Sequence, residues 1–164
     1  MKTAIYPGSF DPITLGHLNI IKRASGCFDK LIVCVMVNSE KKDSGLFTPD
    51  ERVEMIRRVV ARLPNVEVDQ SGLLVSEYAR EKRACALVKG LRAVSDYEYE
   101  LQMALINHKL NPRLETLLLP SSAKYTYISS SVVKEMAHYG ADLSDFVPRE
   151  IIETVNDKIK SGRN

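Results

Sequence analysis

The sequence has no excess of charge of one sign and no long apolar run, and each absence excludes a class of protein. Among 164 residues, 23 are Lys or Arg and 21 are Asp or Glu, so the formal net charge is only +2. Nucleic-acid binders are typically strongly basic, so this balance does not support a nucleic-acid partner. No stretch approaches the roughly 18 apolar residues of a membrane-spanning helix, and no apolar leader follows Met1. We therefore expect a cytoplasmic protein with neither nucleic-acid nor membrane partners.

Cysteine is also scarce. Cys27, Cys34 and Cys85 form no C-x-x-C pair and have no histidine close by in the sequence, which argues against a zinc site or a disulfide framework. Cys34 and Cys85 lie in apolar runs, so we expect both to be buried as small hydrophobic residues. The composition, 45% hydrophobic and 27% charged, is that of a globular protein, and the length favours one domain over residues 1–164.

Apolar runs alternate with segments of helical periodicity. Strands are predicted at 3–6, 31–37, 66–68, 85–88 and 116–119, and helices at 15–24, 49–63, 75–82, 96–110, 129–139 and 148–160. In the helix at 96–110, Tyr97, Leu101, Ala104 and His108 share one face. This alternation predicts an α/β fold with a parallel sheet of about five strands flanked by helices. Ligands bind such sheets beyond the carboxyl ends of the strands.

Groups suited to anions follow four of these strands. They are His17 after the first strand, Lys41 after the second, Lys89 and Arg92 after the fourth, and Ser129, Ser130 and Ser131 after the fifth. His17 and the serines begin helices, where free backbone N–H groups and the helix dipole favour an anion. Each feature alone has an ordinary explanation, as a capping residue, a solvated lysine or a basic turn. Their coincidence at one sheet edge indicates a phosphate site, although neither G-x-G-x-x-G nor a P-loop is present.

Three segments carry a family resemblance. The stretch Thr14-Leu15-Gly16-His17 resembles the [HT]-x-G-H motif of a nucleotidyltransferase superfamily with a Rossmann-like, doubly wound core, and 128–131 resembles its second nucleotide motif. Taken together, 6–17, 89–100 and 127–135 look like the bacterial phosphopantetheine adenylyltransferases, and the similarity covers essentially the whole chain.

The resemblance implies an enzyme with a defined reaction. The adenylyl group of ATP is transferred to 4′-phosphopantetheine by direct in-line attack of the acceptor phosphate on the α-phosphorus. The products are dephospho-coenzyme A and pyrophosphate, and the step is the penultimate one of coenzyme A biosynthesis. The family also implies Mg²⁺, held mainly by ATP phosphates and water without a protein ligand, and a homohexamer.

Matching the motifs residue by residue assigns the roles. The resemblance implies catalytic roles for His17, as the transition-state stabiliser, and for Lys41 and Arg92. It implies ATP contacts for Ser9, Phe10, His17, Gly90, Leu91, Arg92, Glu100, Tyr125, Thr126, Tyr127, Ile128, Ser129, Ser130 and Ser131. It implies phosphopantetheine contacts for Ser9, Lys41, Leu74 and Lys89.

The sequence departs from the family pattern at three positions. Ser9 stands where many relatives have threonine and keeps the hydroxyl. Lys89 stands where arginine is usual, so the charge is kept without the planar bidentate fork. Lys134 replaces the arginine of the broader superfamily motif.

The chemistry agrees with these residue types. A phosphate monoester, with a second pKa of about 6, is mostly dianionic at neutral pH and needs no general base. The site must then supply positioning, cations and N–H donors.

Two alternatives remain open. One is another small nucleotidyltransferase, joining CMP to glycerol phosphate or AMP to nicotinamide mononucleotide, which the 89–100 segment disfavours. The other is a non-catalytic nucleotide-binding module, which His17, Lys41 and Arg92 disfavour. The length leaves no room for the anticodon-binding domain of a tRNA synthetase.

Overall fold

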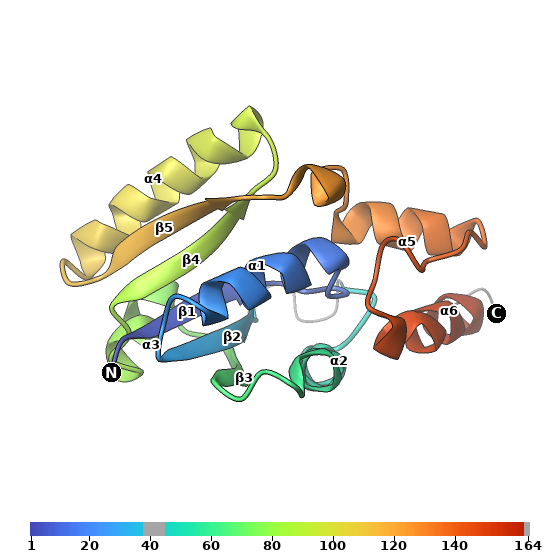
Figure 1. The fold of residues 1–164 in the computed structure, drawn as a ribbon, viewed down its shortest axis with the longest axis horizontal. Helices are drawn as coiled ribbons and strands as arrows, with labels where there is room; N and C mark the ends of the chain where they lie inside the picture. Colours follow the sequence, from blue (N-terminus) through green and yellow to red (C-terminus); the bar gives the residue numbers. More distant parts are fainter. Residues whose placement is uncertain (38–44, 163–164) are drawn as a thin grey trace.

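The computed structural model describes residues 1–37 and 45–162, and its centre is a five-stranded parallel sheet in the order β3-β2-β1-β4-β5 (Figure 1). The strands are β1 (Thr3–Gly8), β2 (Lys30–Met36), β3 (Val66–Ser71), β4 (Ala86–Leu91) and β5 (Glu115–Pro120). The helices are α1 (Leu15–Ser25), α2 (Pro49–Val60), α3 (Val75–Glu81), α4 (Val94–Leu110), α5 (Ser130–His138) and α6 (Ile152–Ser161), with short 3₁₀ turns η2 (Ala123–Tyr125) and η3 (Arg149–Ile151). The predicted parallel α/β fold is confirmed.

Successive residues of the central strands enter cores on opposite faces of the sheet. Leu31 and Val33 of β2 pack in the larger core, which also holds buried residues of α1, α2, α5 and α6. Ile32 and Cys34 pack in the smaller core beside Tyr78 of α3. Residues 31–35 are all 2% exposed or less. The continuous apolar run in the sequence therefore corresponds to a strand covered on both faces, as predicted.

The chain path creates a crevice at the middle of the sheet. From the central strand β1 the chain runs to β2 and β3 on one side, and then crosses to β4 and β5 on the other. The order of the strands thus reverses between β1 and β4, and ligands of open α/β sheets bind at such a reversal, beyond the carboxyl ends of the strands. The fold directs attention to the segments that follow Gly8 and Leu91.

Gly90 allows α1 to lie close against β4. A Cβ atom at this position would come within 3.2 Å of the Cγ1 atom of Ile20 in α1, which is tighter than ordinary packing. The absence of a side chain therefore brings the body of α1 near the end of β4. The first turn of α1 and the end of β4 become opposite walls of the same crevice.

A capping box at Thr48 begins α2. The Thr48 hydroxyl accepts a hydrogen bond from the backbone N–H of Glu51 at 3.2 Å, and the Glu51 carboxylate accepts from the backbone N–H of Thr48 at 2.7 Å. This reciprocal pair satisfies two backbone donors that a helix end leaves free. Lys158 of α6 reaches the same carboxylate at 2.6 Å, which links α6 to the start of α2.

Several strands run further than the sequence pattern indicates, including β3, which continues to Ser71. β1 continues through Pro7 and Gly8, and β4 continues through Lys89 to Leu91, residues predicted to form turns and loops. Parallel pairing supplies the reason, because Gly8 lies opposite Val35 of β2, and Leu91 lies opposite Pro120 of β5. Lys89 therefore projects from a strand rather than from a loop.

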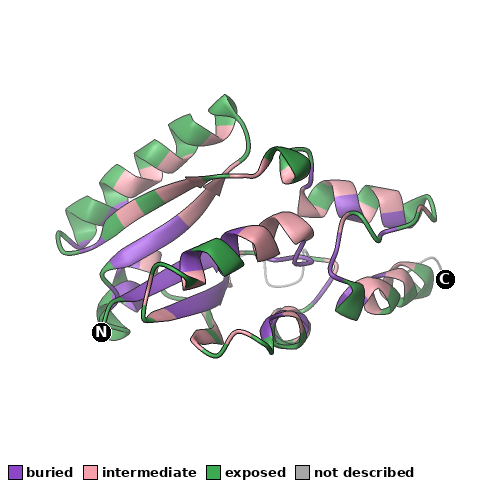
Figure 2. Cartoon of the chain, in the orientation of Figure 1, coloured by how far each residue is buried: buried purple, intermediate pink, exposed green. Residues whose placement is uncertain are grey.

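One burial prediction was wrong. Cys85 is exposed, because it precedes β4, and only Cys34 of the two is buried. Much of α4 is exposed (Figure 2). Tyr97 and Leu101 are 44% and 40% exposed, whereas the buried residue of the helix is Asn107. The face of α4 named by the sequence pattern is thus not the one packed in the monomer. Within the described ranges, no helix is long and apolar enough to cross a membrane.

Candidate active site

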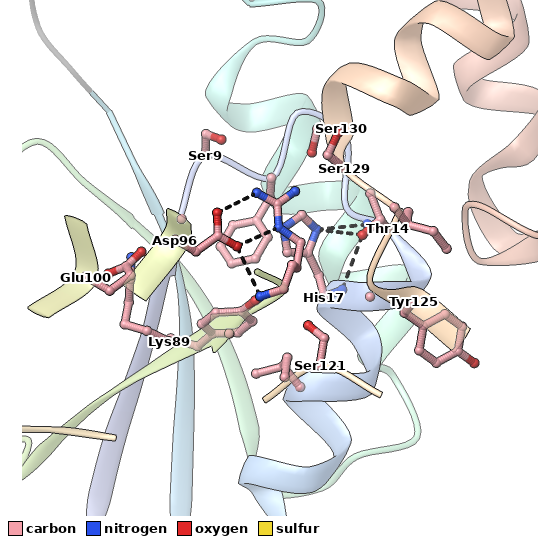
Figure 3. A pocket seen from close by; sticks show the side chains of 18 of the residues that line it. Ser9, Thr14, His17, Lys89, Asp96, Glu100, Ser121, Tyr125, Ser129 and Ser130 are labelled. Carbon is pink, nitrogen blue, oxygen red and sulfur yellow. Dashed lines mark hydrogen bonds and ion pairs between the residues drawn. The ribbon is translucent and has the colours of Figure 1, made fainter. Parts of the chain in front are cut away.

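A cavity of about 510 Å³ lies at the carboxyl ends of β1 and β4. Its walls come from the loop after β1, the first turn of α1, the end of β4, the start of α4 and the segment leading into α5 (Figure 3). The predicted ligand residues that line it are Ser9, Phe10, His17, Lys89, Gly90, Arg92, Glu100, Tyr125, Ile128, Ser129 and Ser130. Residues far apart in the sequence thus meet at the strand reversal.

His17 is held by the start of its own helix. The imidazole Nδ1 lies 3.1 Å from the backbone nitrogen of Thr14 and accepts its N–H, while the Thr14 hydroxyl accepts the backbone N–H of His17 at 3.2 Å. A nitrogen that accepts from a backbone N–H carries no proton itself, so the ring proton is on Nε2. The His17 ring therefore has one N–H donor, on the edge away from Thr14, with which to meet a ligand.

The surroundings of His17 keep its ring neutral. Burial is the main cause that lowers its pKa from 6.5 to about 4, and the positive charges of Arg92 and Lys89 lower it further. The edge of the Phe10 ring packs against it, with the two ring centroids 5.0 Å apart. A neutral imidazole with a fixed tautomer can donate a hydrogen bond to a phosphoryl oxygen without acting as a proton source.

We expect the His17 ring to stay singly protonated well below neutral pH. Its ¹⁵N NMR signals should show a bare Nδ1 and a protonated Nε2 at pH 7 and at pH 5.5, because the pKa is about 4. The His17→Gln variant lacks the signal and assigns it. If the ring took up its second proton with a pKa near the ordinary 6.5, this electrostatic account would be contradicted.

The same pKa difference makes stability depend on pH. The unfolded chain binds the second proton with a pKa near 6.5 and the folded chain only with a pKa near 4, so the contribution of His17 to stability falls as the pH drops through that window.

Asp11 is a buried charge that anchors the loop before His17. Its side chain is 8% exposed and lies 3.4 Å from both the Arg52 Nε of α2 and the Lys134 Nζ of α5. The carboxylate also accepts the backbone N–H groups of Leu46 at 3.0 Å and Phe47 at 2.9 Å. Three segments distant in the sequence are therefore fastened to one side chain.

The same loop contains a strained residue. Phe10 is 1% exposed and has a φ of 47°, a left-handed conformation that bulky residues rarely adopt. Such a conformation persists where the surroundings determine it. Here the Arg52 guanidinium also donates to the carbonyl of Ser9 at 3.3 Å, so the backbone is held on both sides of Phe10.

Two serines at the start of α5 already use their hydroxyl groups in hydrogen bonds within the protein. Ser129 is the N-cap, and its hydroxyl accepts the backbone N–H of Val132 at 3.1 Å. The Ser130 hydroxyl donates to the carbonyl of Pro12 at 2.8 Å. Ser130 thus fastens α5 to the loop before His17, and the donors that α5 leaves for an anion are its first backbone N–H groups.

Both cations in the cavity wall face carboxylates. Lys89 Nζ lies 3.3 Å from Glu100, and Arg92 Nε lies 3.2 Å from Asp96. Each pair joins the end of β4, or the turn after it, to the first half of α4. The pairs hold the cations in the wall of the cavity that His17 also lines. Figure 3 shows Lys89 beside Glu100 in this wall.

A second cavity of about 250 Å³ adjoins the first. The two share Ser9, Lys89, Tyr99 and Glu100 as well as Pro7 and Gly8. The rest of the second wall is mostly apolar and consists of Met36, Val75, Leu87, Met103, Ala104, Asn107 and Thr116. The site therefore consists of a polar chamber and a more apolar chamber that meet at Ser9 and Lys89.

Some predicted contact residues lie elsewhere. Leu74 is 60% exposed at the start of α3 and lines neither chamber, whereas the next residue, Val75, does. Leu91 borders a separate shallow hollow together with Val94 and Tyr97. Thr126, Tyr127 and Ser131 do not line the polar chamber. Lys41 lies outside the described residues.

Sequence reasoning missed two acidic residues of this region. Asp96 follows Arg92 by four positions, which is the spacing of an ion pair on a helix, and this spacing was the available signal. Asp11 offered no local signal, because its partners come from residues 35 or more positions away.

The family is established by comparison with known proteins. The model of the cytidylyltransferase-like family matches residues 5–136. A phosphopantetheine adenylyltransferase of Clostridium botulinum (strain Hall) is 58% identical over 160 residues, covering 97% of this chain and 96% of the relative. The phosphopantetheine adenylyltransferase of Caldanaerobacter subterraneus subsp. tengcongensis is 54% identical, covering 98% of this chain and 99% of the relative.

A solved structure supports the fold. A protein from Vibrio parahaemolyticus, described as a nicotinate-nucleotide adenylyltransferase, superposes with a TM-score of 0.72 at 17% identity, covering 94% of this chain and 99% of that one. At this identity the likeness concerns the fold alone. With the near-complete match to the curated relatives, the chain belongs to the cytidylyltransferase-like family of nucleotidyltransferases and, within it, to the phosphopantetheine adenylyltransferases.

Proposed function

We propose that this protein transfers the adenylyl group of ATP to 4′-phosphopantetheine and releases pyrophosphate, which makes dephospho-coenzyme A in the penultimate step of coenzyme A biosynthesis. The observation that carries the proposal is the 58% identity, over 97% of the chain, to a relative that bears the name of this activity. The polar chamber at the strand reversal, which brings together His17, Arg92 and the start of α5, supports it.

The acceptor phosphate is its own nucleophile in this proposal. It attacks the α-phosphorus of ATP in line with the departing pyrophosphate, so no covalent intermediate with the protein forms. The protein has to position two anions and stabilise charge that grows on the phosphoryl oxygens. His17 would donate from Nε2 to such an oxygen, and Arg92 would neutralise charge beside it.

The two chambers suggest where each substrate binds. ATP would occupy the polar chamber, and the pantetheine arm would occupy the apolar one, with Lys89 and Ser9 at their junction meeting the acceptor phosphate. Lys41, from the motif match, is proposed to contact that phosphate too. Val75 would contribute the apolar wall that the sequence assigned to Leu74.

Magnesium is proposed as the cofactor, held by ATP phosphates and water. Asp96 and Glu100, the carboxylates in the chamber wall, are each paired with a cation. Within the ranges the structure describes, no three histidine, cysteine or acidic side chains group as a metal site. Mg²⁺ commonly binds through substrate phosphates and keeps several waters, so this donor set suits it. When bound, the ion would neutralise charge on the leaving pyrophosphate.

A homohexamer in the cytoplasm completes the proposal, with small-molecule substrates and no nucleic acid or membrane involved. Support for self-association comes from one face of α4, where Val94 is 83% exposed, Leu105 65% and Leu101 40%. An apolar helix face of this extent is typical of an interface between subunits.

The deciding experiment compares acceptors. Purified protein with Mg²⁺ and ATP should release pyrophosphate with 4′-phosphopantetheine, and far less with nicotinamide or nicotinate mononucleotide. With CTP and glycerol 3-phosphate it should also release far less. Equal release with one of these acceptors would refute the assignment. A native mass spectrum of the same sample would report the number of subunits and any dephospho-coenzyme A carried through purification.

A further inference from the structure

Asp96 makes the closest contacts to Arg92 at the rim of the polar chamber. Its carboxylate accepts the Arg92 Nε–H at 3.2 Å, an Nη2–H at 3.4 Å and the Arg92 backbone N–H at 3.0 Å (Figure 3). Asp96 lies at the third position of α4, and Arg92 precedes that helix. The carboxylate thus ties both the side chain and the backbone of Arg92 to the start of α4.

The contacts with Asp96 use only part of the hydrogen-bonding capacity of the Arg92 guanidinium. An arginine has five N–H groups in a planar fork, and Asp96 engages Nε and one hydrogen of Nη2. Both hydrogens of Nη1 and the other hydrogen of Nη2 remain, since within the described residues the guanidinium has no further hydrogen-bond partner. Three donors in one fixed plane suit the oxygens of a phosphate.

Asp96 is ionised in this arrangement. Burial raises the pKa of its carboxyl, but hydrogen bonds from the side chain and backbone of Arg92 outweigh burial and hold the pKa below its ordinary value. The charges facing the pair from the rest of the chamber are those of Lys89 and Glu100, which are paired with each other, while His17 is neutral.

Arg92 would otherwise be free to rotate. Its side chain is 43% exposed, and a long exposed side chain loses considerable rotamer entropy when a ligand fixes it. A carboxylate that fixes the plane of the guanidinium before the ligand arrives removes much of that cost at binding. The backbone contact matters as well, because it keeps the carboxylate on Arg92 even while the free donors bind an anion.

We propose that Asp96 is a positioning residue that holds the Arg92 guanidinium in the wall of the polar chamber that His17 also lines, ready for the polyphosphate of the nucleotide. The inference rests on the proposed function for its kinetic consequence. The alternative is that the Asp96 carboxylate occupies the place of a ligand phosphate on Arg92, so that the nucleotide has to displace it. We call this alternative the stand-in role. The two roles predict opposite effects when the charge of Asp96 is removed.

The test is a double-mutant cycle with Asp96→Asn, Arg92→Met and the double variant. Asp96→Asn should lower kcat/KM for ATP about tenfold, the scale of one misplaced charge-assisted contact, with the KM for 4′-phosphopantetheine unchanged. In the Arg92→Met background, Asp96→Asn should change kcat/KM by less than about twofold, because positioning acts only through Arg92. Glu98→Gln removes one exposed charge from the same helix outside the chamber and should leave both constants at the wild-type value.

Binding measured by calorimetry separates this inference from the proposed function. Inorganic pyrophosphate and ATP should bind Asp96→Asn more weakly than the wild type, whether or not phosphopantetheine is the acceptor. If the wild type transfers nothing to phosphopantetheine, the proposed function fails and this binding arm still tests Asp96. Tighter binding of ATP by Asp96→Asn would establish the stand-in role instead. If Asp96→Asn lowered kcat/KM equally in the wild-type and Arg92→Met backgrounds, Asp96 would serve only to begin α4. Either of these two results overturns the proposal.

Discussion

Replacing His17 with alanine should lower kcat about a hundred- to a thousandfold, which is the usual effect of deleting one preorganised donor to a transition-state oxyanion. The structure supplies the reason for a loss in kcat rather than in KM. The ring is neutral and its Nε2–H is fixed by the contact of Nδ1 with Thr14, so this donor needs no rearrangement as charge develops. Steady-state kinetics of pyrophosphate release, with ATP and phosphopantetheine varied in turn, measure both constants.

Two further variants sharpen this prediction. His17→Gln keeps an N–H near the position of Nε2 and should recover part of kcat, whereas His17→Leu keeps the bulk alone and should not. The KM for ATP should stay within a few-fold of the wild type in all three variants, because the interaction is made in the transition state. If ATP binding were lost while turnover persisted, His17 would be a ground-state ligand.

Asp11→Ala should lower the free energy of unfolding by about 3–5 kcal/mol, the usual cost of breaking a buried ion pair by removing one partner. The variant leaves the Arg52 side chain, only 11% exposed, without its carboxylate, and leaves the N–H groups of Leu46 and Phe47 without an acceptor. Urea unfolding followed by circular dichroism, at one fixed protein concentration, gives the difference.

The matched control is a surface ion pair. Glu67→Ala removes a carboxylate that lies 2.6 Å from Lys30 but is 63% exposed, and should cost less than about 1 kcal/mol. An Asp11→Ala variant no less stable than Glu67→Ala would show that the buried network contributes little. In that event, packing and the Arg52–Ser9 hydrogen bond would have to maintain the strained conformation of Phe10.

Local patterns in the sequence predict the parts of this fold that depend on near neighbours. Most of the run at 31–37 forms the buried strand β2, Thr48 begins a helix and His17 lies in a first helical turn. Each of these features depends on periodicity or on capping residues three positions apart. The position of the site also followed from the sequence, since parallel strands bring the residues after their carboxyl ends to one edge.

Features set by distant contacts could not be predicted in this way. The exposure of Cys85 depends on where β4 begins, and the extension of β4 to Leu91 depends on its pairing with β5. The charge of Asp11 is balanced by Arg52 and Lys134, a pairing that no local pattern encodes. Val75 replaces Leu74 in the chamber wall because the start of α3 turns one side chain inward and its neighbour outward.

The contact between Thr14 and His17 has a consequence for engineering. Glutamate is a common residue at the third helical position of a capping box, as at Glu51 in α2. A selection for heat resistance alone would therefore accept His17→Glu as a well-formed helix start, and would place a negative charge in the wall of the polar chamber. The capping boxes at Thr14 and Thr48 therefore differ in which substitutions they tolerate. The one at Thr48 can be optimised for melting temperature, whereas the one at Thr14 has to be selected for turnover.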